Sequence, residues 1–201
     1  MTAVSTTEKT DNARQPRADA RRNRQRILDA AVEVFSEQGV EAQIDDVARR
    51  ADLGVGTIYR HFPTKDALVT ELIRQKFRQF LEHAREALAA GGDPFDALVA
   101  MIRANAELCA RDASLQHAMT GPGESAWEHA RVEIEQLNAV LGELVTRAQD
   151  AGAMRRDIGV HDIPMLMCGV ASTMTHNAPG FDWHRHLELV IEMLRRPGHG
   201  D

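Results

Sequence analysis

Apolar residues recur every three or four positions along most of this chain, and this spacing restricts the possible folds more than any other feature. In the second half of the chain the repeat runs through Phe95, Leu98, Val99, Ile102 and Ala106. Such a repeat places apolar side chains on one face of an α-helix. No segment shows the sustained alternation of apolar and polar residues that a half-buried strand requires. The sequence therefore predicts an all-α fold without a sheet.

Local signals divide the first 90 residues into four helices. Gly39 is well placed to end the first helix, Pro63 stops the third, and Thr64 is suited to cap the fourth. The second and third helices are too short to be stable in isolation. We therefore expect the first and fourth helices to cover their apolar sides. The expected ranges are about 19–38, 44–51, 55–61 and 65–89.

A linker with the sequence Ala-Gly-Gly-Asp-Pro, residues 90–94, precedes the second part of the chain. The repeat described above predicts one helix that begins at Phe95. Gly152 is placed to end a later helix, and residues 177–180 separate the last two. These later helices are expected at about 124–150, 161–176 and 183–195.

Charge is distributed unevenly along the chain. The net charge of −6 argues against a nucleic-acid partner, but residues 1–80 carry +2 and residues 81–201 carry −8. The N-terminal part also contains a run of arginines. By itself this run is either a phosphate-binding arm or a solvated tail. Its members are Arg14, Arg17, Arg21, Arg22, Arg24 and Arg26.

Residues 43–62 have the pattern of a helix-turn-helix, which is two short helices joined by a tight turn, here with Gly54. Apolar side chains of both helices, such as Val47 and Ile58, face a common core. The opposite face of the second helix carries hydrogen-bond donors, and such a face can enter a DNA groove. These donors are Thr57, Tyr59, Arg60 and His61.

Each donor suits a particular group of DNA. Thr57 and the backbone N–H groups around it lie at a helix N-terminus, where phosphate binds readily. Tyr59 can donate to phosphate, and His61 can donate to a phosphate or a base edge. Arg60 can form two hydrogen bonds with one guanine. Lys65 begins the next helix, where the helix dipole disfavours a cation. A bound phosphate would compensate for that position.

The stretch RQRILDAAVEVFSEQGVEAQIDDVARRADLGVGTIYRHFPTKDAL resembles the N-terminal DNA-binding domain of the TetR family of transcriptional regulators. The resemblance covers about residues 20–70. It includes Gly39, an Asp-x-Val-Ala-x-x-Ala helix at 45–51 and a Gly-Thr-Ile-Tyr-x-x-Phe-x-x-Lys motif at 56–65. It implies a sequence-specific regulator that binds an inverted-repeat operator as a homodimer. Most such regulators are repressors that a small-molecule effector releases.

The resemblance also implies which residues contact DNA and how the chain is divided. Residues 1–18 are predicted to be a disordered polar and basic tail. Residues 19–64 form the DNA-binding domain, with the helix-turn-helix at about 43–62, and residues 65–201 form an α-helical domain for effector binding and dimerisation. The predicted DNA contacts are Arg21, Arg22, Gln43, Val55, Gly56, Thr57, Tyr59, Arg60, His61 and Lys65.

Two positions depart from the family pattern. The family usually has Ser or Thr just before the second helix, as a cap and phosphate donor, whereas this chain has Ala42 and Gln43. Where the turn usually has Gly, this chain has Asp52. Asp tolerates turn conformations, but its charge would lie near DNA and would weaken binding.

In the TetR family the last two helices form the dimer interface through a four-helix bundle. The segment 161–176 is apolar on two sides, so it needs two partners. The predicted interface residues are Met165, Cys168, Leu187, Val190, Ile191 and Leu194. The effector pocket is expected between helices of the same domain. Methionine suits adaptable sites, although a stripe of methionines more often belongs to the core. The candidates are Met101, Met119, Trp127, Met167 and Met174.

Several classes of function lack their signals. No His or Cys residues have metal-ligand spacing, and no nucleophile elbow, Walker A loop or dinucleotide motif occurs. We therefore expect no metal, no cofactor and no enzyme. No apolar run could span a bilayer, and a cytoplasmic protein is expected. The alternatives are an all-α ligand-binding or enzymatic protein with a vestigial helix-turn-helix, a module that pairs with another helix-turn-helix protein, and an activator rather than a repressor.

Overall fold

Helices make up the regular structure of this protein. The computed structural model describes residues 8–111, 128, 130–175 and 179–197, and within these ranges no β-strand forms. An isolated bridge pairs Met154 with Arg195. The prediction of an all-α fold is therefore confirmed. The chain divides into two compact units, Met1–Leu68 and Val69–Asp201, and each is described by itself.

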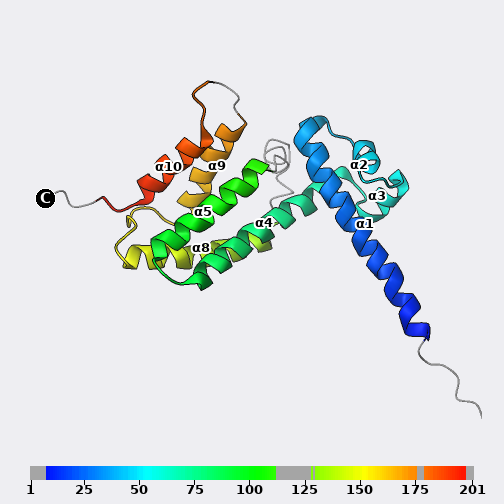
Figure 1. Ribbon diagram of the computed structural model, residues 1–201, viewed down its shortest axis with the longest axis horizontal. Helices are drawn as coiled ribbons and strands as arrows, with labels where there is room; N and C mark the ends of the chain where they lie inside the picture. The colour runs from blue at the N-terminus through cyan, green and yellow to red at the C-terminus, as the bar shows by residue number, and fades with distance from the viewer. Residues whose placement is uncertain (1–7, 112–127, 129, 176–178, 198–201) are drawn as a thin grey trace, which may run out of the picture. The chain divides into compact units, whose positions relative to one another are not determined.

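The first unit contains α1 (Glu8–Gln38), a short 3₁₀ helix (Gly39–Glu41), α2 (Ile44–Arg50), α3 (Val55–His61) and the first residues of α4 (Lys65–Ala90). Figure 1 shows α2 and α3 beside α1. Apolar side chains from α1, α2, α3 and the start of α4 are buried, which is why two helices of seven residues each are stable here. They include Ile27, Val34, Phe35, Val47, Ile58, Phe62 and Leu68.

The predicted ends of these helices agree with the structure except at the start of α1. Gly39 follows α1 with a φ of 62°, a conformation that favours glycine. The hydroxyl of Thr64 accepts a hydrogen bond from the Ala67 N–H at 3.0 Å, as expected of a helix cap. However, α1 begins at Glu8, within the segment predicted to be a disordered tail. High polarity does not separate a disordered segment from a helical one.

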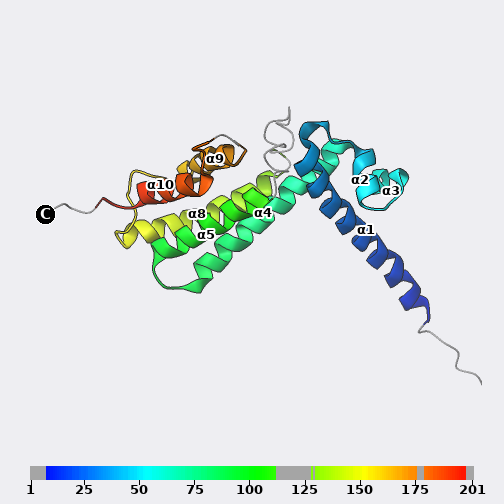
Figure 2. The same ribbon diagram turned by 45° about the horizontal axis from the view of Figure 1, so that its top comes forward.

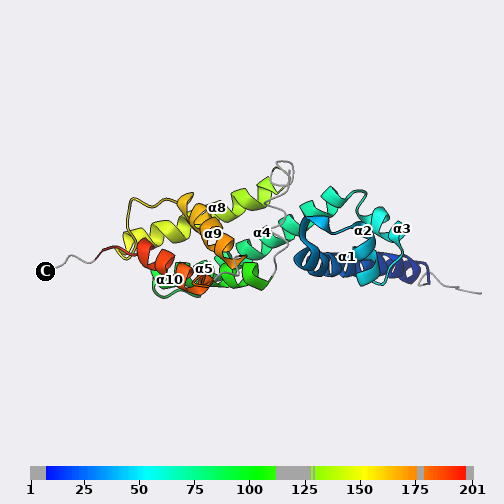
Figure 3. The same cartoon turned by 90° about the horizontal axis from the view of Figure 1, so that it is seen from above.

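The second unit contains the rest of α4, α5 (Pro94–Arg111), α8 (Arg131–Asp150), α9 (Asp162–Met174) and α10 (Trp183–Leu194). The helices α4, α5 and α8 run side by side in Figure 2, and Figure 3 shows α9 and α10 next to α5. The apolar repeat that predicted α5 is buried at the centre of this unit. The start predicted for the long helix, near residue 124, lies outside the described residues.

Side-chain caps begin two of these helices. The carboxylate of Asp93 accepts hydrogen bonds from the N–H groups of Phe95 and Asp96, at 2.9 and 3.0 Å. The carboxylate of Asp182 accepts similar bonds from the first turn of α10. Such caps satisfy backbone donors that have no partner within the helix. They explain why the linker ends at residue 93 and why α10 begins at Trp183.

A buried carboxylate joins α8 to α4. Glu133 is only 7% exposed. Its Oε1 accepts a hydrogen bond from Arg74 Nε at 3.0 Å and lies 3.5 Å from Arg78 Nε. Burial by itself raises the pKa of Glu133, but hydrogen bonds and the charge of Arg74 outweigh burial, and the pKa lies below its usual value. The group is therefore ionised at neutral pH.

None of the described helices combines the length and the apolar character that crossing a bilayer demands.

Candidate DNA interface and effector cavity

The helix-turn-helix buries one side of α3 and exposes the other. Ile58 and Phe62 are buried in the core of the first unit. Tyr59 is 47% exposed and Val55 37% exposed, although both are large apolar side chains. Arg60 is also exposed, and its guanidinium donates a hydrogen bond to Thr57 Oγ1 at 2.9 Å. Exposed aromatic and basic groups on one helix face are the pattern expected of a nucleic-acid contact.

The turn between α2 and α3 contains a strained residue. Asp52 has a φ of 51°, a left-handed conformation that only glycine adopts without cost. Arg26 of α1 supports this turn, because its guanidinium donates to the carbonyl of Ala51 at 2.7 Å and lies 3.8 Å from the Asp52 carboxylate. At position 52 this chain therefore has Asp in a backbone conformation that favours the glycine of the family pattern.

We expect Asp52→Gly to stabilise the first unit by about 0.5–1 kcal/mol, because it removes the strain of the left-handed conformation. It should also tighten DNA binding at low salt by removing a negative charge. Thermal unfolding and DNA titrations would measure both effects. Asp52→Asn is the matched control, because it removes the charge and keeps the side chain. A lower unfolding temperature for Asp52→Gly would show that the contacts of the Asp52 carboxylate outweigh the strain.

The N-terminus of α2 is capped without the serine or threonine that is usual in the family. The Gln43 N–H donates to the Asp46 carboxylate at 3.2 Å. The Gln43 side-chain amide donates instead to the carbonyl of Glu41, at 2.8 Å. Asp46 therefore takes part in capping, and Gln43 itself is exposed. In this position the Gln43 side chain can still exchange its bond to Glu41 for one to a phosphate.

Two basic side chains lie over aromatic rings of the first unit. The Lys65 ammonium is 5.6 Å from the centre of the Phe35 ring, and the Arg24 guanidinium is 4.5 Å from the centre of the Phe62 ring. Such cation–π contacts hold a charge in place. Phe62 directly follows α3, so Arg24 lies beside the end of α3. Arg24 belongs to the arginine run but is absent from the predicted contacts, since nothing in the sequence links it to α3.

The two DNA contacts that were predicted in α1 are exposed. Arg21 and Arg22 lie on the surface of the helix, and Arg22 forms an ion pair with Asp19. Thr57 and His61 are half-buried, and Gly56 is exposed. All ten predicted DNA contacts thus lie in the first unit, and none of them is fully buried.

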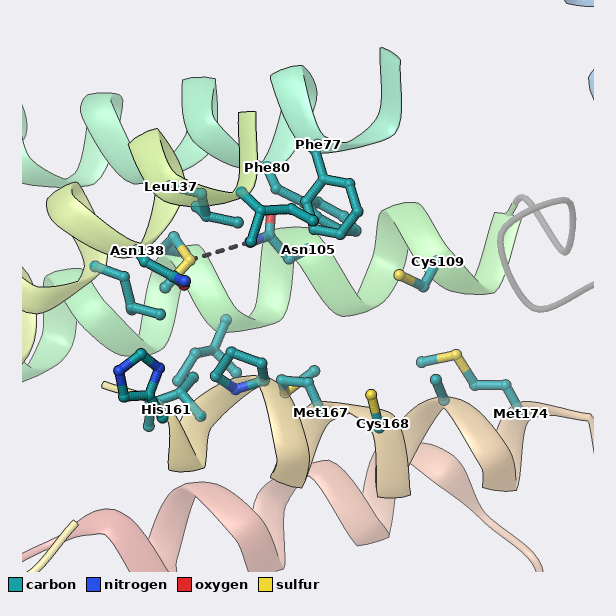
Figure 4. Close-up of a pocket in the computed structure, with 17 residues that line it drawn as sticks. Phe77, Phe80, Asn105, Cys109, Leu137, Asn138, His161, Met167, Cys168 and Met174 are labelled. Carbon is teal, nitrogen blue, oxygen red and sulfur yellow. Dashed lines mark hydrogen bonds between the residues drawn. The ribbon is translucent and has the colours of Figure 1, made fainter. Parts of the chain in front are cut away.

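The second unit contains a cavity of about 350 Å³ between α4, α5, α8 and α9 (Figure 4). Its wall is predominantly apolar. Three of the predicted pocket residues, Met101, Met167 and Met174, line it. The other two, Met119 and Trp127, lie outside the described residues. Lining residues that were not predicted include Phe77, Phe80, Asn105, Leu137, Asn138 and His161.

Few polar groups interrupt this apolar wall. Asn105 of α5 lies with its Oδ1 2.7 Å from His83 Nδ1 of α4, and its Nδ2 lies 3.1 Å from the Met101 sulfur. Asn138 and His161 contribute the other nitrogen-bearing side chains. No lysine or arginine lines the cavity in the part of the chain that the structure describes. The cavity is thus suited to an apolar ligand that carries few polar atoms.

The two cysteines face each other across this cavity, Cys109 from α5 and Cys168 from α9 (Figure 4). Burial raises the pKa of the Cys168 thiol above its usual value. Cys168 was predicted to lie at the dimer interface. The structure places it among the cavity residues, and the residue is also exposed at the surface.

Alkylation of Cys168 by a maleimide at pH 7.5 is expected to be slower in the folded protein than in the unfolded chain. The reason is that the thiolate is the nucleophile and a raised pKa lowers its fraction. The rate should rise further with pH than it does for a free thiol. Mass spectrometry of a Cys109→Ser variant would measure this site alone. Equal rates in folded and unfolded protein would contradict the assignment of Cys168 to the cavity.

The other predicted interface residues lie mostly in the core. Met165 is 64% exposed, but the four predicted residues of α10 are buried within their own chain, namely Leu187, Val190, Ile191 and Leu194. The exposed apolar residues of α10 are Leu189 and Met193, at 52% and 41%. The strongest apolar stripe of this helix covers the core, and periodicity could not tell that stripe from one that meets a second chain.

Sequence comparison places both halves of the chain in known groups. Residues 27–72 match the bacterial regulatory proteins of the tetR family, and residues 93–196 match the C-terminal domain of SbtR-like transcriptional regulators. The chain belongs to the TetR family. The prediction of a DNA-binding transcriptional regulator is thereby confirmed.

Individual relatives agree with this assignment. The chain is 30% identical over 178 residues to the HTH-type transcriptional repressor KstR of Mycolicibacterium smegmatis. The aligned segment covers 87% of this chain and 87% of KstR. It is 32% identical over 182 residues to the fatty acid metabolism regulator protein of Bacillus subtilis, covering 84% of this chain and 91% of that protein. The first of these relatives is named as a transcriptional repressor and the second as a regulator protein.

Solved structures share the fold. A TetR transcription regulatory protein from Mycobacterium vanbaalenii is 37% identical with a TM-score of 0.65, covering 90% of this chain and 99% of that one. FadR from Bacillus subtilis, solved in complex with stearoyl-CoA, is 23% identical with a TM-score of 0.70, covering 85% and 96%. The second likeness concerns the fold alone.

Within the described ranges, no three His, Cys, Asp or Glu side chains come together as a candidate metal site.

Proposed function

We propose that this TetR-family regulator is a repressor that binds an inverted-repeat operator as a homodimer and is released by an apolar effector with an acyl chain. The observation that carries this proposal is the cavity of about 350 Å³, whose wall is predominantly apolar. Cavities of a few hundred Å³ with such walls are typical small-molecule sites. A filled core would have argued against a ligand in the second unit.

The exposed face of α3 supports the DNA part of the proposal. Tyr59, Arg60 and Val55 are exposed there. Two further basic side chains are nearby, because Lys65 begins the next helix and Arg24 lies over the ring of Phe62. A single helix of this length reads only a few base pairs, so two copies are needed for a specific site. A symmetric dimer would bind half-sites related by the same two-fold axis.

Exposed apolar side chains of α9 and α10 support dimerisation. Met165, Leu189 and Met193 are each more than 40% exposed, as is Phe181, which precedes α10. Exposed apolar residues that gather on neighbouring helices mark interaction surfaces. We propose that these residues, rather than the buried stripe of α10, contact the second copy.

The nature of the effector follows from the cavity wall. A charged ligand buried there would lose its hydration without gaining a partner of opposite charge. An alkyl or acyl chain would instead replace water against methionine, leucine and phenylalanine side chains. The similarity to a regulator of fatty acid metabolism supports an acyl compound. Likewise, FadR, which has the same fold, was solved with stearoyl-CoA.

Arg60→Ala is expected to relax base preference at one position of each half-site, with about 1–3 kcal/mol less discrimination there. Arg60 is exposed and its bond to Thr57 is easily exchanged for one to a base. Binding to a set of duplexes that differ at single positions would measure this. An equal loss on every duplex would show that Arg60 contacts only phosphate.

The proposal is tested by two experiments in sequence. The purified protein would first select bound duplexes from a random pool at two salt concentrations. An enriched inverted repeat is expected, and no enrichment at either salt would contradict specific binding by the protein alone. The selected duplex would then be titrated with acyl-CoA compounds of 4, 10 and 16 carbons. Release that grows with chain length, and none by free coenzyme A, is expected. Equal release by all of them would contradict an apolar effector.

A further inference from the structure

Asn105 is one of the few polar side chains in the cavity wall. It lies in the middle of α5, between Met101 and Cys109, which also line the cavity (Figure 4). The side chain is half-buried and surrounded by apolar residues. An amide in such surroundings is costly unless its donors and acceptor are paired.

The acceptor of this amide is paired with α4. Oδ1 of Asn105 lies 2.7 Å from Nδ1 of His83, a short distance that is typical of a good hydrogen bond. The opposite orientation would place the amide oxygen at 3.1 Å from the Met101 sulfur. A thioether has no hydrogen to donate, so that orientation would leave the amide oxygen without a donor. His83 therefore fixes the amide with its NH₂ group on the side of Met101.

The donor of the amide is poorly paired. Among the described residues, the acceptor that Nδ2 meets is the thioether of Met101, which is a weak acceptor. The NH₂ group has two hydrogens, and one contact to sulfur does not satisfy both. A ligand oxygen in the cavity would therefore gain a hydrogen bond that costs the protein little to provide.

We propose that Asn105 is the polar anchor of the cavity and donates a hydrogen bond from Nδ2 to the carbonyl oxygen of a neutral acyl effector, such as a thioester, an ester or a ketone. This inference rests on the proposed function and names the ligand class that the cavity selects. A free carboxylate is disfavoured, because no lysine or arginine lines the described cavity wall to balance its charge. His83 acts as a positioning residue, since it contacts the amide and does not line the cavity.

The test compares three ligands that share one apolar chain. Methyl decanoate carries a neutral carbonyl, decyl methyl ether lacks it, and decanoate carries a charge. Each would displace the neutral fluorescent probe N-phenyl-1-naphthylamine from the full-length protein. For the wild type we expect the ester to bind roughly tenfold more tightly than the ether, as one hydrogen bond provides. Decanoate should be the weakest ligand of the three.

Variants assign the preference to a residue. Asn105→Leu is expected to bring the ratio of ester to ether affinity close to one while the probe and the ether still bind. Asn138→Leu is the matched control, because Asn138 also presents an amide to the cavity, and its ratio should stay at the wild-type value. His83→Ala should lower the ratio partway, and His83→Gln, which keeps a donor, should restore part of it. A role for His83 in folding alone would leave the ratio unchanged.

Each outcome has a distinct meaning. Equal binding of ester and ether by the wild type, or an unchanged ratio in Asn105→Leu, overturns the proposal for Asn105 and leaves the effector cavity intact. Failure of every ligand to displace the probe overturns both the anchor and the effector cavity. Operator release by the ester, measured separately, decides whether ligand binding in the cavity acts on DNA binding.

Discussion

Replacing either Tyr59 or Lys65 with alanine is expected to weaken DNA binding about ten- to a hundredfold on every duplex, because each side chain should donate to a phosphate. Tyr59 is exposed on α3, and Lys65 begins α4 with its ammonium held over the Phe35 ring. The dependence of affinity on salt should also become shallower for Lys65→Ala, by about one released counterion for each phosphate that the variant no longer binds. Fluorescence anisotropy on the selected operator and a scrambled duplex, at several salt concentrations, would measure both effects.

Two controls distinguish a missing phosphate interaction from a disrupted structure. Lys65→Arg keeps the charge and should retain most of the affinity. Arg85→Ala removes an exposed positive charge from the second unit and should leave binding unchanged. Weaker binding to one duplex alone would show that Tyr59 or Lys65 reads bases instead.

Replacing Glu133 with alanine is expected to destabilise the second unit by about 2–3 kcal/mol, because it leaves Arg74 and Arg78 without their shared carboxylate. This loss of unfolding free energy is smaller than is usual for a fully buried ion pair. The reason is that the two arginine side chains are 41% and 48% exposed and can turn toward water. Urea unfolding would measure the loss of stability. Glu135→Ala is the matched control, because Glu135 lies two residues away on the same helix and is exposed.

The same group makes stability depend on pH. The pKa of Glu133 is lowered in the folded protein, so the unfolded chain binds its proton more readily. The stabilisation is therefore complete at neutral pH and is lost as the pH falls below about 4.5 and through the lower, folded-state pKa. We expect Glu133→Gln to be less stable than wild type at pH 7 and to lose less of its stability between pH 5 and pH 3. If Glu133→Gln lost as much stability between pH 5 and pH 3 as the wild type does, this prediction would be contradicted.

Local signals were sufficient to predict the helix-turn-helix. Gly39, Pro63 and Thr64 act through their own backbone or side chain, so their effect on a helix end is visible in the sequence. The turn at Asp52 was also recognisable, because its position relative to α2 and α3 is fixed by a few residues. The placement of Arg24 over Phe62 was not, since it depends on how α1 packs on α3.

The composition of the cavity wall, by contrast, could not be predicted from local signals. The wall is made mostly by residues of four helices, and these helices are far apart in sequence, since α4 ends at Ala90 and α9 begins only at Asp162. A preference for methionine selected Met101, Met167 and Met174, and all three line this cavity. It gave no reason to select Asn105 or Asn138, because a polar residue on a helix is usually exposed. Helix α10 has one buried apolar stripe and a second, exposed set of apolar residues. The sequence could not show which of them faces the core, since each is compatible with a core and with an interface.

The cavity wall also has a chemical consequence for anyone who works with the protein. Five of its residues carry sulfur, namely Met101, Cys109, Met167, Cys168 and Met174. Peroxide converts a thioether into a sulfoxide, which is polar and larger, and it converts thiols into sulfenic acids. Ligand affinity should therefore fall with the age and aeration of a preparation, without any change in helix content. Two samples of identical sequence could then give different effector responses, and thioredoxin-linked methionine sulfoxide reductases would restore the methionine part of the loss.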